Sequence, residues 1–199
     1  MSQRIVLASG SEIRQNLLKN AGVSFEVQIA RVDEESIRNS LLAEAASPRN
    51  ISDALAEQKA LRISIKNPEA LVIGCDQILE ISGSILAKPK SIDEARAQLV
   101  QLRGSRHSLL SAVVVYEDGA PVWRHVGQVR MYMHDFSDSY LDAYLARNWD
   151  SIQHTVGCYK LEEEGVRLFS KIEGDYFTVL GLPLLELLSY FFQRGVLVK

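Results

Sequence analysis

The sequence predicts an α/β fold with a mixed, twisted sheet and flanking helices, and three observations support this prediction. Strand-like apolar runs and amphipathic helical segments are interspersed along the chain and do not fall into separate blocks. The run Leu71-Val72-Ile73 is continuously apolar, as expected for a strand buried on both faces. With 199 residues and 47% hydrophobic content, the chain can bury a core of ordinary size.

Each element of the N-terminal half follows from its own pattern of apolar residues. Short apolar or alternating runs predict strands, whereas apolar residues spaced three and four apart predict helices. Ser11 can cap the first helix and Gly22 can end it. The expected elements are a strand at 4–8, a helix at 12–22, a strand at 25–30, helical segments within 36–65 divided at Pro48, and a strand that ends at Asp76.

The C-terminal half continues the same mixture of strands and helices. Its expected elements are a hairpin at 78–86 turned at Ser82-Gly83-Ser84, a helix at 92–102 behind a Ser91 to Glu94 capping box, strands at 108–116 and 121–133, a helix at 137–147, an irregular stretch at 157–169 with a strand at its end, and a closing helix at 182–194. We therefore expect a single domain over 1–199, with a possible second lobe from about 105 to 155.

Composition and charge exclude several classes of partner and cofactor. The net charge is −3, so no excess of positive charge exists to neutralise a nucleic-acid polymer. Two cysteines, Cys75 and Cys158, cannot form a metal cluster by themselves and are expected to be small buried residues. The N-terminus resembles neither a signal peptide nor a membrane span, so we expect a cytoplasmic protein without a membrane partner.

Asp76 is the first candidate for a working acid. It follows the apolar run that begins at Leu71, so it is expected at a strand end, where α/β proteins commonly place their chemistry. The alternative is that Asp76 caps the following turn through backbone N–H groups. Lys88, twelve residues further on and held in extended geometry by Pro89, favours the catalytic interpretation because it can reach a phosphate.

The turn Ser9-Gly10-Ser11, with Arg14 one turn into the helix, is a candidate phosphate seat. Small residues let the backbone approach a ligand, the start of a helix offers free N–H groups, and Arg14 can pair with phosphate oxygens. Lys59 is a second candidate cation. The alternatives are a plain connection for the turn and a solvated surface position for either lysine.

Acidic residues suggest a metal site and a contact to a base. The run Asp33-Glu34-Glu35 and Asp76 could converge on an oxygen-liking ion such as Mg²⁺, unless the run is simply a solvated loop. Glycines and aromatics in 157–162 and 172–184 could form a wall for a flat ring, with Glu162 accepting two hydrogen bonds from one edge of a base. The alternative for Tyr159 and Tyr176 is core packing.

Taken together, these motifs resemble the Maf family of nucleoside triphosphate pyrophosphatases, which release a monophosphate and pyrophosphate. The resemblance covers nearly the whole chain. Its motifs are Leu7-Ala8-Ser9-Gly10-Ser11 with Arg14, Val32-Asp33-Glu34, Lys59-Ala60, Ile73-Gly74-Cys75-Asp76-Gln77, Lys88-Pro89, and Ile172-Glu173-Gly174-Asp175-Tyr176 through Gly181-Leu182-Pro183-Leu184.

The resemblance implies a fold like that of the Maf and inosine triphosphate pyrophosphatases, with two lobes around a central cleft, and a homodimer. It implies that Asp76 is the general base that deprotonates the attacking water. Glu34 and Asp76 would lie at a divalent cation, Mg²⁺ or Mn²⁺. The positions that match the triphosphate site are Ser9, Arg14, Lys59 and Lys88, and Ser11 belongs to the same turn.

The resemblance is closest to the branch that hydrolyses 7-methyl-GTP. Gln77 and Glu162 match that branch, whereas the branch acting on dTTP and UTP usually has threonine and glutamine there. Ile13 occupies a third position that separates the branches, where an aromatic residue is expected, and Glu12-Ile13-Arg14 replaces a common Pro-Arg-Arg. The alternatives are a dTTP or UTP pyrophosphatase, or a non-catalytic nucleotide-binding regulator of cell division.

Overall fold

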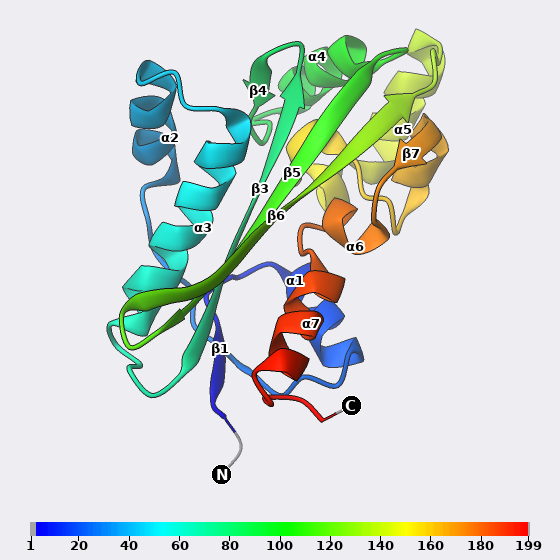
Figure 1. Cartoon of the computed structure of the whole chain (residues 1–199). Helices are drawn as coiled ribbons and strands as arrows, with labels where there is room; N and C mark the ends of the chain where they lie inside the picture. Colours follow the sequence, from blue (N-terminus) through cyan, green and yellow to red (C-terminus); the bar gives the residue numbers. More distant parts are fainter. Residues whose placement is uncertain (1–2, 199) are drawn as a thin grey trace. The chain divides into compact units, whose positions relative to one another are not determined.

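A computed structural model describes residues 3–198 and contains a sheet with helices beside it (Figure 1). The strands are β1 Ile5–Leu7, β2 Glu26–Val27, β3 Leu71–Ile81, β4 Ser84–Leu86, β5 Arg106–Glu117, β6 Ala120–Met133 and β7 Phe169–Glu173. The helices are α1 Glu12–Asn20, α2 Glu34–Ala43, α3 Pro48–Ser64, α4 Ile92–Leu102, α5 Asp138–Ile152, α6 Tyr176–Val179 and α7 Leu184–Gln193, with 3₁₀ turns η1 Val156–Cys158 and η2 Glu164–Leu168.

The strands form a 7-stranded mixed sheet in the order β2-β1-β3-β5-β6-β7, with β4 paired to β3. Strand β1 runs parallel to both β2 and β3, whereas the β3–β4 and β6–β7 pairs are antiparallel. This arrangement confirms the predicted α/β class with a mixed sheet and flanking helices. It also confirms the division at Pro48, which occupies the first turn of α3 behind the capping side chain of Ser47.

The chain divides into two compact units. The first comprises the segment up to Gln77, Leu110–Gly127 and the segment from Tyr176 onward, and the second comprises Ile78–Leu109 and Gln128–Asp175. Strands β3, β5 and β6 contribute residues to both units. The segment Leu110–Gly127 of the β5–β6 hairpin belongs to the first unit, and the second lobe expected at about 105–155 stays a prediction.

In the first unit, α3 covers one face of the sheet. Small and branched residues on this helix pack on every second residue of the strands, as the two-residue repeat of a strand requires. The buried cluster contains Ala56, Ala60 and Ile63 from α3, and Val6, Ala8, Ala70, Val72, Leu110, Ala112, Val114, Tyr116 and Val126 from the strands and the residues beside them. The opposite face carries α6 and the residue before α7, since a Cβ added at Gly127, the neighbour of Val126, would meet the side chains of Thr178 and Pro183.

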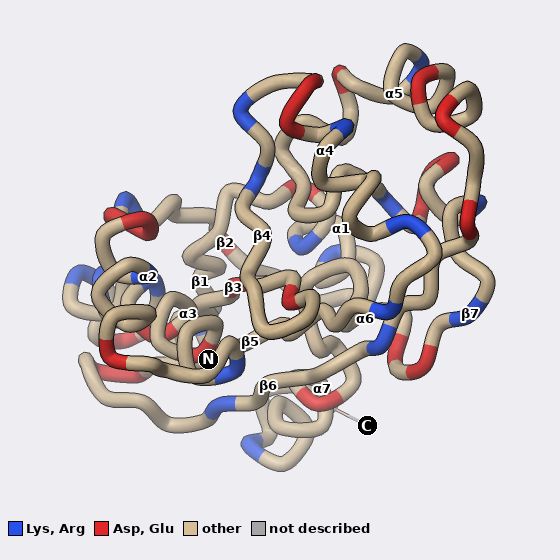
Figure 2. The backbone as a smooth tube through the Cα atoms, turned by 90° about the horizontal axis from the view of Figure 1, so that it is seen from above, with Lys and Arg blue, Asp and Glu red and all other residues tan. Residues whose placement is uncertain are grey.

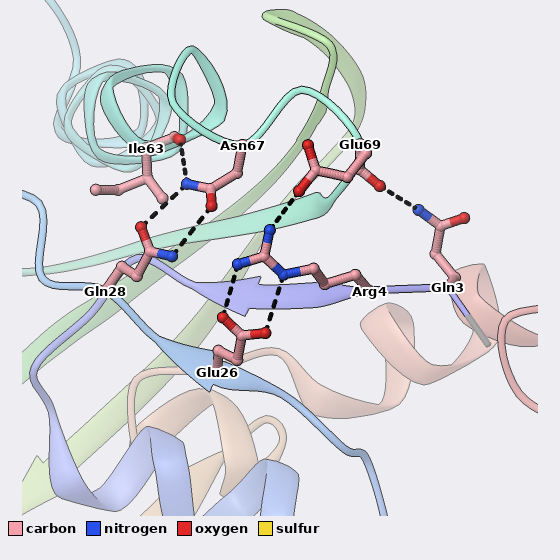
Figure 3. Close-up of polar contacts among 7 residues, drawn as sticks. All are labelled: Gln3, Arg4, Glu26, Gln28, Ile63, Asn67 and Glu69. Carbon is pink, nitrogen blue, oxygen red and sulfur yellow. Dashed lines mark hydrogen bonds and ion pairs between the residues drawn. The ribbon is translucent and has the colours of Figure 1, made fainter. Parts of the chain in front are cut away.

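Polar contacts tie the N-terminal edge of this sheet together (Figure 3). The guanidinium of Arg4 donates two hydrogen bonds to Glu26, at 2.9 and 2.7 Å, and a third to Glu69. Gln28 and Asn67 exchange a reciprocal pair of amide hydrogen bonds. These contacts link β2 and β1 to the turn between α3 and β3, so the short edge strand is held by side chains as well as by its backbone.

Three sequence expectations are corrected in this part of the structure. Strand β3 does not end at Asp76 but continues to Ile81, so Asp76 lies within the strand. The strand expected at 25–30 is reduced to the exposed pair Glu26–Val27. Helix α6 was not expected, because four residues are too few to display a helical repeat.

The surface carries charges of both signs. Figure 2 shows lysine and arginine positions interleaved with aspartate and glutamate positions along the chain, in keeping with the net charge of −3. Among residues 3–198, the helices are all too short or too polar to cross a bilayer.

The core of the second unit contains a buried histidine. His107 on β5 is 1% exposed, and its Nε2 lies 2.8 Å from the hydroxyl of Tyr159. Its ring also contacts that of Phe169, whereas Nδ1 is buried without a hydrogen-bond partner among residues 3–198. Burial lowers the pKa of His107 from 6.5 to about 4, because the charged ring would lose its hydration.

This burial predicts acid sensitivity of the fold. The unfolded chain binds a proton at His107 below pH 6.5 and the folded chain does so only near pH 4, so stability is full above 6.5 and falls as the pH drops. When the pH is lowered from 7.5 to 5.0, the free energy of unfolding in urea is expected to fall by about 2 kcal/mol more for the wild type than for His107→Gln. His154→Gln, at an exposed histidine, is the matched control and should retain the wild-type slope.

Candidate active site

The motif Gly74-Cys75-Asp76-Gln77 divides its side chains between the two faces of β3. Successive residues of a strand point to opposite faces. Gly74 faces α3, where an added Cβ would overlap the carbonyl oxygen of Ala56, and Asp76 points to the same side. Gln77 points to the other side, toward α6, and Figure 1 shows α3 and α6 on opposite sides of β3.

Lys59 joins two carboxylates on the α3 side. Its Nζ lies 2.7 Å from Oδ1 of Asp76 and 2.9 Å from Oε1 of Glu34 at the start of α2. The side chains of Lys59 and Asp76 are only 10% and 8% exposed, so both charges are largely withdrawn from water. Withdrawing two charges from water costs free energy that their mutual attraction must offset, so a buried pair of this kind is weak evidence for a stabilising role.

The protonation of Asp76 is set by two opposing effects. Burial raises the pKa of this carboxyl above its ordinary value, and the attraction and hydrogen bond of Lys59 offset part of the rise. Among residues 3–198, no group donates a hydrogen bond to Oδ2. Asp76 therefore presents one free oxygen with increased basicity, which is what a general base for water requires.

Removing the lysine tests this balance directly. In Lys59→Met, the two influences that most strongly oppose the burial effect are lost, so the pKa of Asp76 is expected to rise further. A base acts when deprotonated, so the acidic limb of the profile of activity against pH should move to higher pH. Lys66→Met, at an exposed lysine just beyond α3, should leave the limb in place, and an unmoved limb in Lys59→Met would contradict the assigned pairing.

The candidate phosphate seat is organised around Arg14. Its Nε donates to the carbonyl of Gly181 at 2.8 Å, and its Nη1 lies 3.3 Å from both Ser9 Oγ and the carbonyl of Cys75. No residue from 3 to 198 accepts a hydrogen bond from Nη2. Ser11 stands at the N-cap of α1 as expected, but its hydroxyl makes no capping bond. Nη2, the Ser11 hydroxyl and the N–H groups that begin α1 are thus available to an anion.

Ile13 and Cys75 lie near the Arg14 seat in the first unit, and their roles in specificity and reactivity stay predictions. Ile13 lies half-buried in the first turn of α1. Cys75 is fully buried, and burial raises the pKa of its thiol to about 11. Such a thiol is inert at neutral pH, so Cys75 contributes to the site through its backbone carbonyl.

Lys88 and Glu162 belong to the second unit. Lys88 is exposed on the segment between β4 and α4, and Glu162 is exposed between η1 and η2. Glu162 begins a run of three glutamates whose other members are engaged, Glu163 with Lys160 and Glu164 with Arg147. Within residues 3–198, Glu162 itself forms no hydrogen bond or ion pair, so its carboxylate is available to a ligand.

Some functional atoms had no signal in the sequence. The carbonyl oxygens of Cys75 and Gly181 orient Arg14, but any residue type supplies a carbonyl. The glycine at 181 is the one clue, because its backbone has φ +90° and an added Cβ would lie 3.1 Å from Nη2 of Arg14. The role of Gly181 in the phosphate seat therefore follows only from the tertiary structure, in which α1 and the segment after α6 lie side by side.

Comparison with protein families agrees with this geometry. A family model described as a Maf-like protein matches residues 4–193. The chain belongs to the Maf family. This confirms the resemblance found in the sequence motifs, and the mixed sheet with flanking helices is the expected fold of a Maf protein.

Curated relatives of this Maf protein align over nearly their full lengths. A protein of Roseobacter denitrificans, 63% identical over 199 residues with all of both chains covered, is named nucleoside triphosphate pyrophosphatase. One of Ruegeria pomeroyi, 61% identical with 99% of both chains covered, has the same name. A more distant relative from Brucella abortus, 44% identical over 189 residues and covering 95% of both chains, is named 7-methyl-GTP pyrophosphatase. These names agree with the predicted hydrolase class.

Proposed function

We propose that this Maf protein is a nucleoside triphosphate pyrophosphatase that acts on 7-methyl-GTP or another modified nucleotide. The observation that carries the proposal is the buried Asp76, whose Oδ1 is held 2.7 Å from Lys59 while Oδ2 receives no hydrogen bond from residues 3–198. The Arg14 seat in the same unit supplies a place for phosphate. Relatives at 63% and 61% identity bear the name of this activity.

The chain's own residues account for the steps of hydrolysis. Oδ2 of Asp76 takes a proton from a water molecule as the water oxygen bonds to phosphorus. The bond to the bridging oxygen between the α and β phosphates breaks, and its electron pair leaves with pyrophosphate. Arg14, Lys59 and the N-terminus of α1 offset the negative charge, which is the main requirement of phosphoryl chemistry.

Glu34 and Asp76 are proposed to hold a divalent cation, Mg²⁺ or Mn²⁺. Their oxygens lie 2.9 and 2.7 Å from the single Nζ of Lys59, so the two carboxylates lie close together, and the ion would bind beside them and not at the position that Lys59 occupies. Residues 3–198 contain no cluster of three or more acidic, histidine or cysteine ligands. Two carboxylates suit an ion such as Mg²⁺, which keeps waters and binds substrate phosphates, and the ion would supply further charge neutralisation.

The preference for a modified guanine rests on Glu162. Guanine presents N1–H and an exocyclic amine side by side, and a carboxylate can accept from both. Methylation at N7 adds positive charge that an anion favours, whereas thymine and uracil lack this pair of donors. The name of the Brucella abortus relative supports the same substrate.

A substrate panel tests the activity. Purified protein is incubated with 7-methyl-GTP, GTP, dTTP and UTP in the presence of Mg²⁺ or Mn²⁺, and released pyrophosphate is measured. Turnover with preference for 7-methyl-GTP is expected. Preference for dTTP or UTP would favour the pyrimidine alternative, and tight nucleotide binding without any turnover would favour a regulatory role in cell division. Metal removal with a chelator is expected to abolish turnover.

Exchange of Glu162 for glutamine tests the base contact. An amide has one acceptor oxygen in place of two, and its NH2 group would face the second donor of guanine, so kcat/KM for 7-methyl-GTP is expected to fall by about 10- to 100-fold, with little change for UTP. Glu163→Gln is the matched control, because that neighbour is bound to Lys160 and Ser151. An unchanged rate in Glu162→Gln would remove Glu162 from base recognition.

We also propose a homodimer in the cytoplasm, as the family resemblance implies. Sedimentation velocity of the purified chain measures the mass directly. A single species at twice the chain mass is expected, and a monomer at working concentration would contradict this part of the proposal.

A further inference from the structure

Gln77 occupies a position linked by resemblance to substrate choice, yet its amide group is turned into the protein. Its Nε2 lies 3.0 Å from Ser111 Oγ, 3.2 Å from the carbonyl of Thr178 and 2.9 Å from the carbonyl of Val179. Two N–H groups thus serve three acceptors. Both donors are committed to β5 and α6, and a base could meet only the amide oxygen.

The chemistry of the acceptors fixes the orientation of this amide. Backbone carbonyls only accept hydrogen bonds, so a flipped amide would place its oxygen against the oxygens of Thr178 and Val179. Ser111 adds a second link, because its hydroxyl donates to the Thr178 carbonyl at 2.7 Å and is itself an acceptor for Gln77. The side chain of Gln77 therefore fastens α6 to β3 and β5.

A second contact, on strand β6, also restricts the position of helix α6. Gly127 on β6 has no side chain, and an added Cβ would lie 2.8 Å from both Cγ2 and Oγ1 of Thr178. The helix is thus held closely on the face of the sheet opposite α3. Two residues after α6, the carbonyl of Gly181 receives the hydrogen bond from Nε of Arg14.

We propose that Gln77 is a positioning residue for the phosphate seat, which acts through α6 and the Gly181 carbonyl to orient the guanidinium of Arg14. This inference rests on the proposed function, in which Arg14 binds the triphosphate. The adjacent residues Asp76 and Gln77 then serve the same reaction from opposite faces of β3. Gln77 affects the handling of every nucleotide, because the triphosphate is common to all of them.

The test uses inorganic tripolyphosphate, a probe that has phosphates but no base. Its dissociation constant is measured by calorimetry for the wild type and for Gln77→Met, which keeps the length of the side chain and removes both donors. About a 10-fold weaker constant is expected for Gln77→Met, together with a similar loss of kcat/KM for 7-methyl-GTP, GTP and UTP. Loss confined to 7-methyl-GTP, with unchanged tripolyphosphate binding, would overturn the inference.

A double-mutant cycle shows whether Gln77 acts through Arg14. Arg14→Ala should weaken tripolyphosphate binding, and adding Gln77→Met should produce little further loss, because the group that Gln77 positions is gone. Fully additive losses would overturn the inference. Ser111→Ala removes a single hydrogen-bonding group of the same network and should weaken tripolyphosphate binding in the same way but by less. This variant replaces Gln77→Met in the test if Gln77→Met does not fold.

The outcomes separate this inference from the proposed function. A wild-type chain that binds tripolyphosphate but releases pyrophosphate from no nucleotide would reject the proposed activity, while the binding cycle would still decide the role of Gln77. A wild-type chain that does not bind tripolyphosphate at all would overturn the positioning role.

Discussion

Asp76→Asn is expected to lower the rate of pyrophosphate release by about 10³-fold, the usual contribution of a general base. An asparagine is nearly the same size and its oxygen can still accept the hydrogen bond from Lys59, so the fold is expected to persist. Glu34 remains 2.9 Å from Lys59 and continues to balance its charge. The rate is measured by coupled detection of pyrophosphate, with circular dichroism as the check on folding.

The control for Asp76→Asn is the same exchange at Asp118. That residue lies exposed in the turn between β5 and β6 with φ +47°, a conformation that asparagine tolerates well. Asp118→Asn should keep the wild-type rate. If folded Asp76→Asn retained more than a tenth of the wild-type rate, Asp76 would not be the base.

Gly74→Ala is expected to produce the largest loss of stability, on the order of 4 kcal/mol or more. The added Cβ would overlap the carbonyl oxygen of Ala56 and lie 2.7 Å from the amide nitrogen of Ala60. Both atoms are backbone of α3, so no side-chain rotation relieves the clash and the helix must move away from β3. The free energy of unfolding in urea, or insoluble expression, measures the result.

Gly83→Ala is the matched control for this substitution. Gly83 lies in the β3–β4 turn with open space around it, but its φ of +82° disfavours a side chain. A loss of about 1 kcal/mol is therefore expected from backbone strain alone. Equal losses in the two variants would contradict the close approach of α3 and β3.

That close approach connects the fold to the chemistry. Lys59 lies on the buried face of α3, one residue before Ala60, and reaches Asp76 because no side chain at Gly74 separates the helix from the strand. Any relief of the clash in Gly74→Ala moves Lys59 away from Asp76. Residual folded protein of this variant is therefore expected to be inactive as well as unstable.

Much of the fold could be predicted from local patterns. The helices on either side of Pro48, the capping of α4 by Ser91 and the β3–β4 hairpin all follow from residues close together in the chain. The predicted end of strand β3 at Asp76 was wrong, because Asp76 and Gln77 are polar and polar residues usually mark the end of a strand. Here they remain inside the strand because distant groups satisfy them.

For the candidate site too, some features could be predicted from the sequence and others could not. Residue types and their order were sufficient to select Asp76, Lys59, Glu34 and Arg14, since carboxylates, cations and small-residue turns carry phosphate chemistry wherever they occur together. The partners of each residue were not predictable. Asp76 is paired with a lysine 17 positions earlier, and Gln77 with carbonyls about a hundred positions later.

By itself, the sequence predicted the family and the mixed α/β fold, which are confirmed, and it selected candidate residues for phosphate chemistry, whose roles stay predictions. It did not determine that Asp76 and Gln77 face opposite ways, because the strand was expected to end at Asp76 and the two-residue repeat applies only within a strand. Only the tertiary structure decided that α3 meets one face with Lys59 and that α6 meets the other with its carbonyls. Those contacts depend on packing between segments far apart in the chain, and no local pattern encodes which backbone oxygen will lie beside a given side chain.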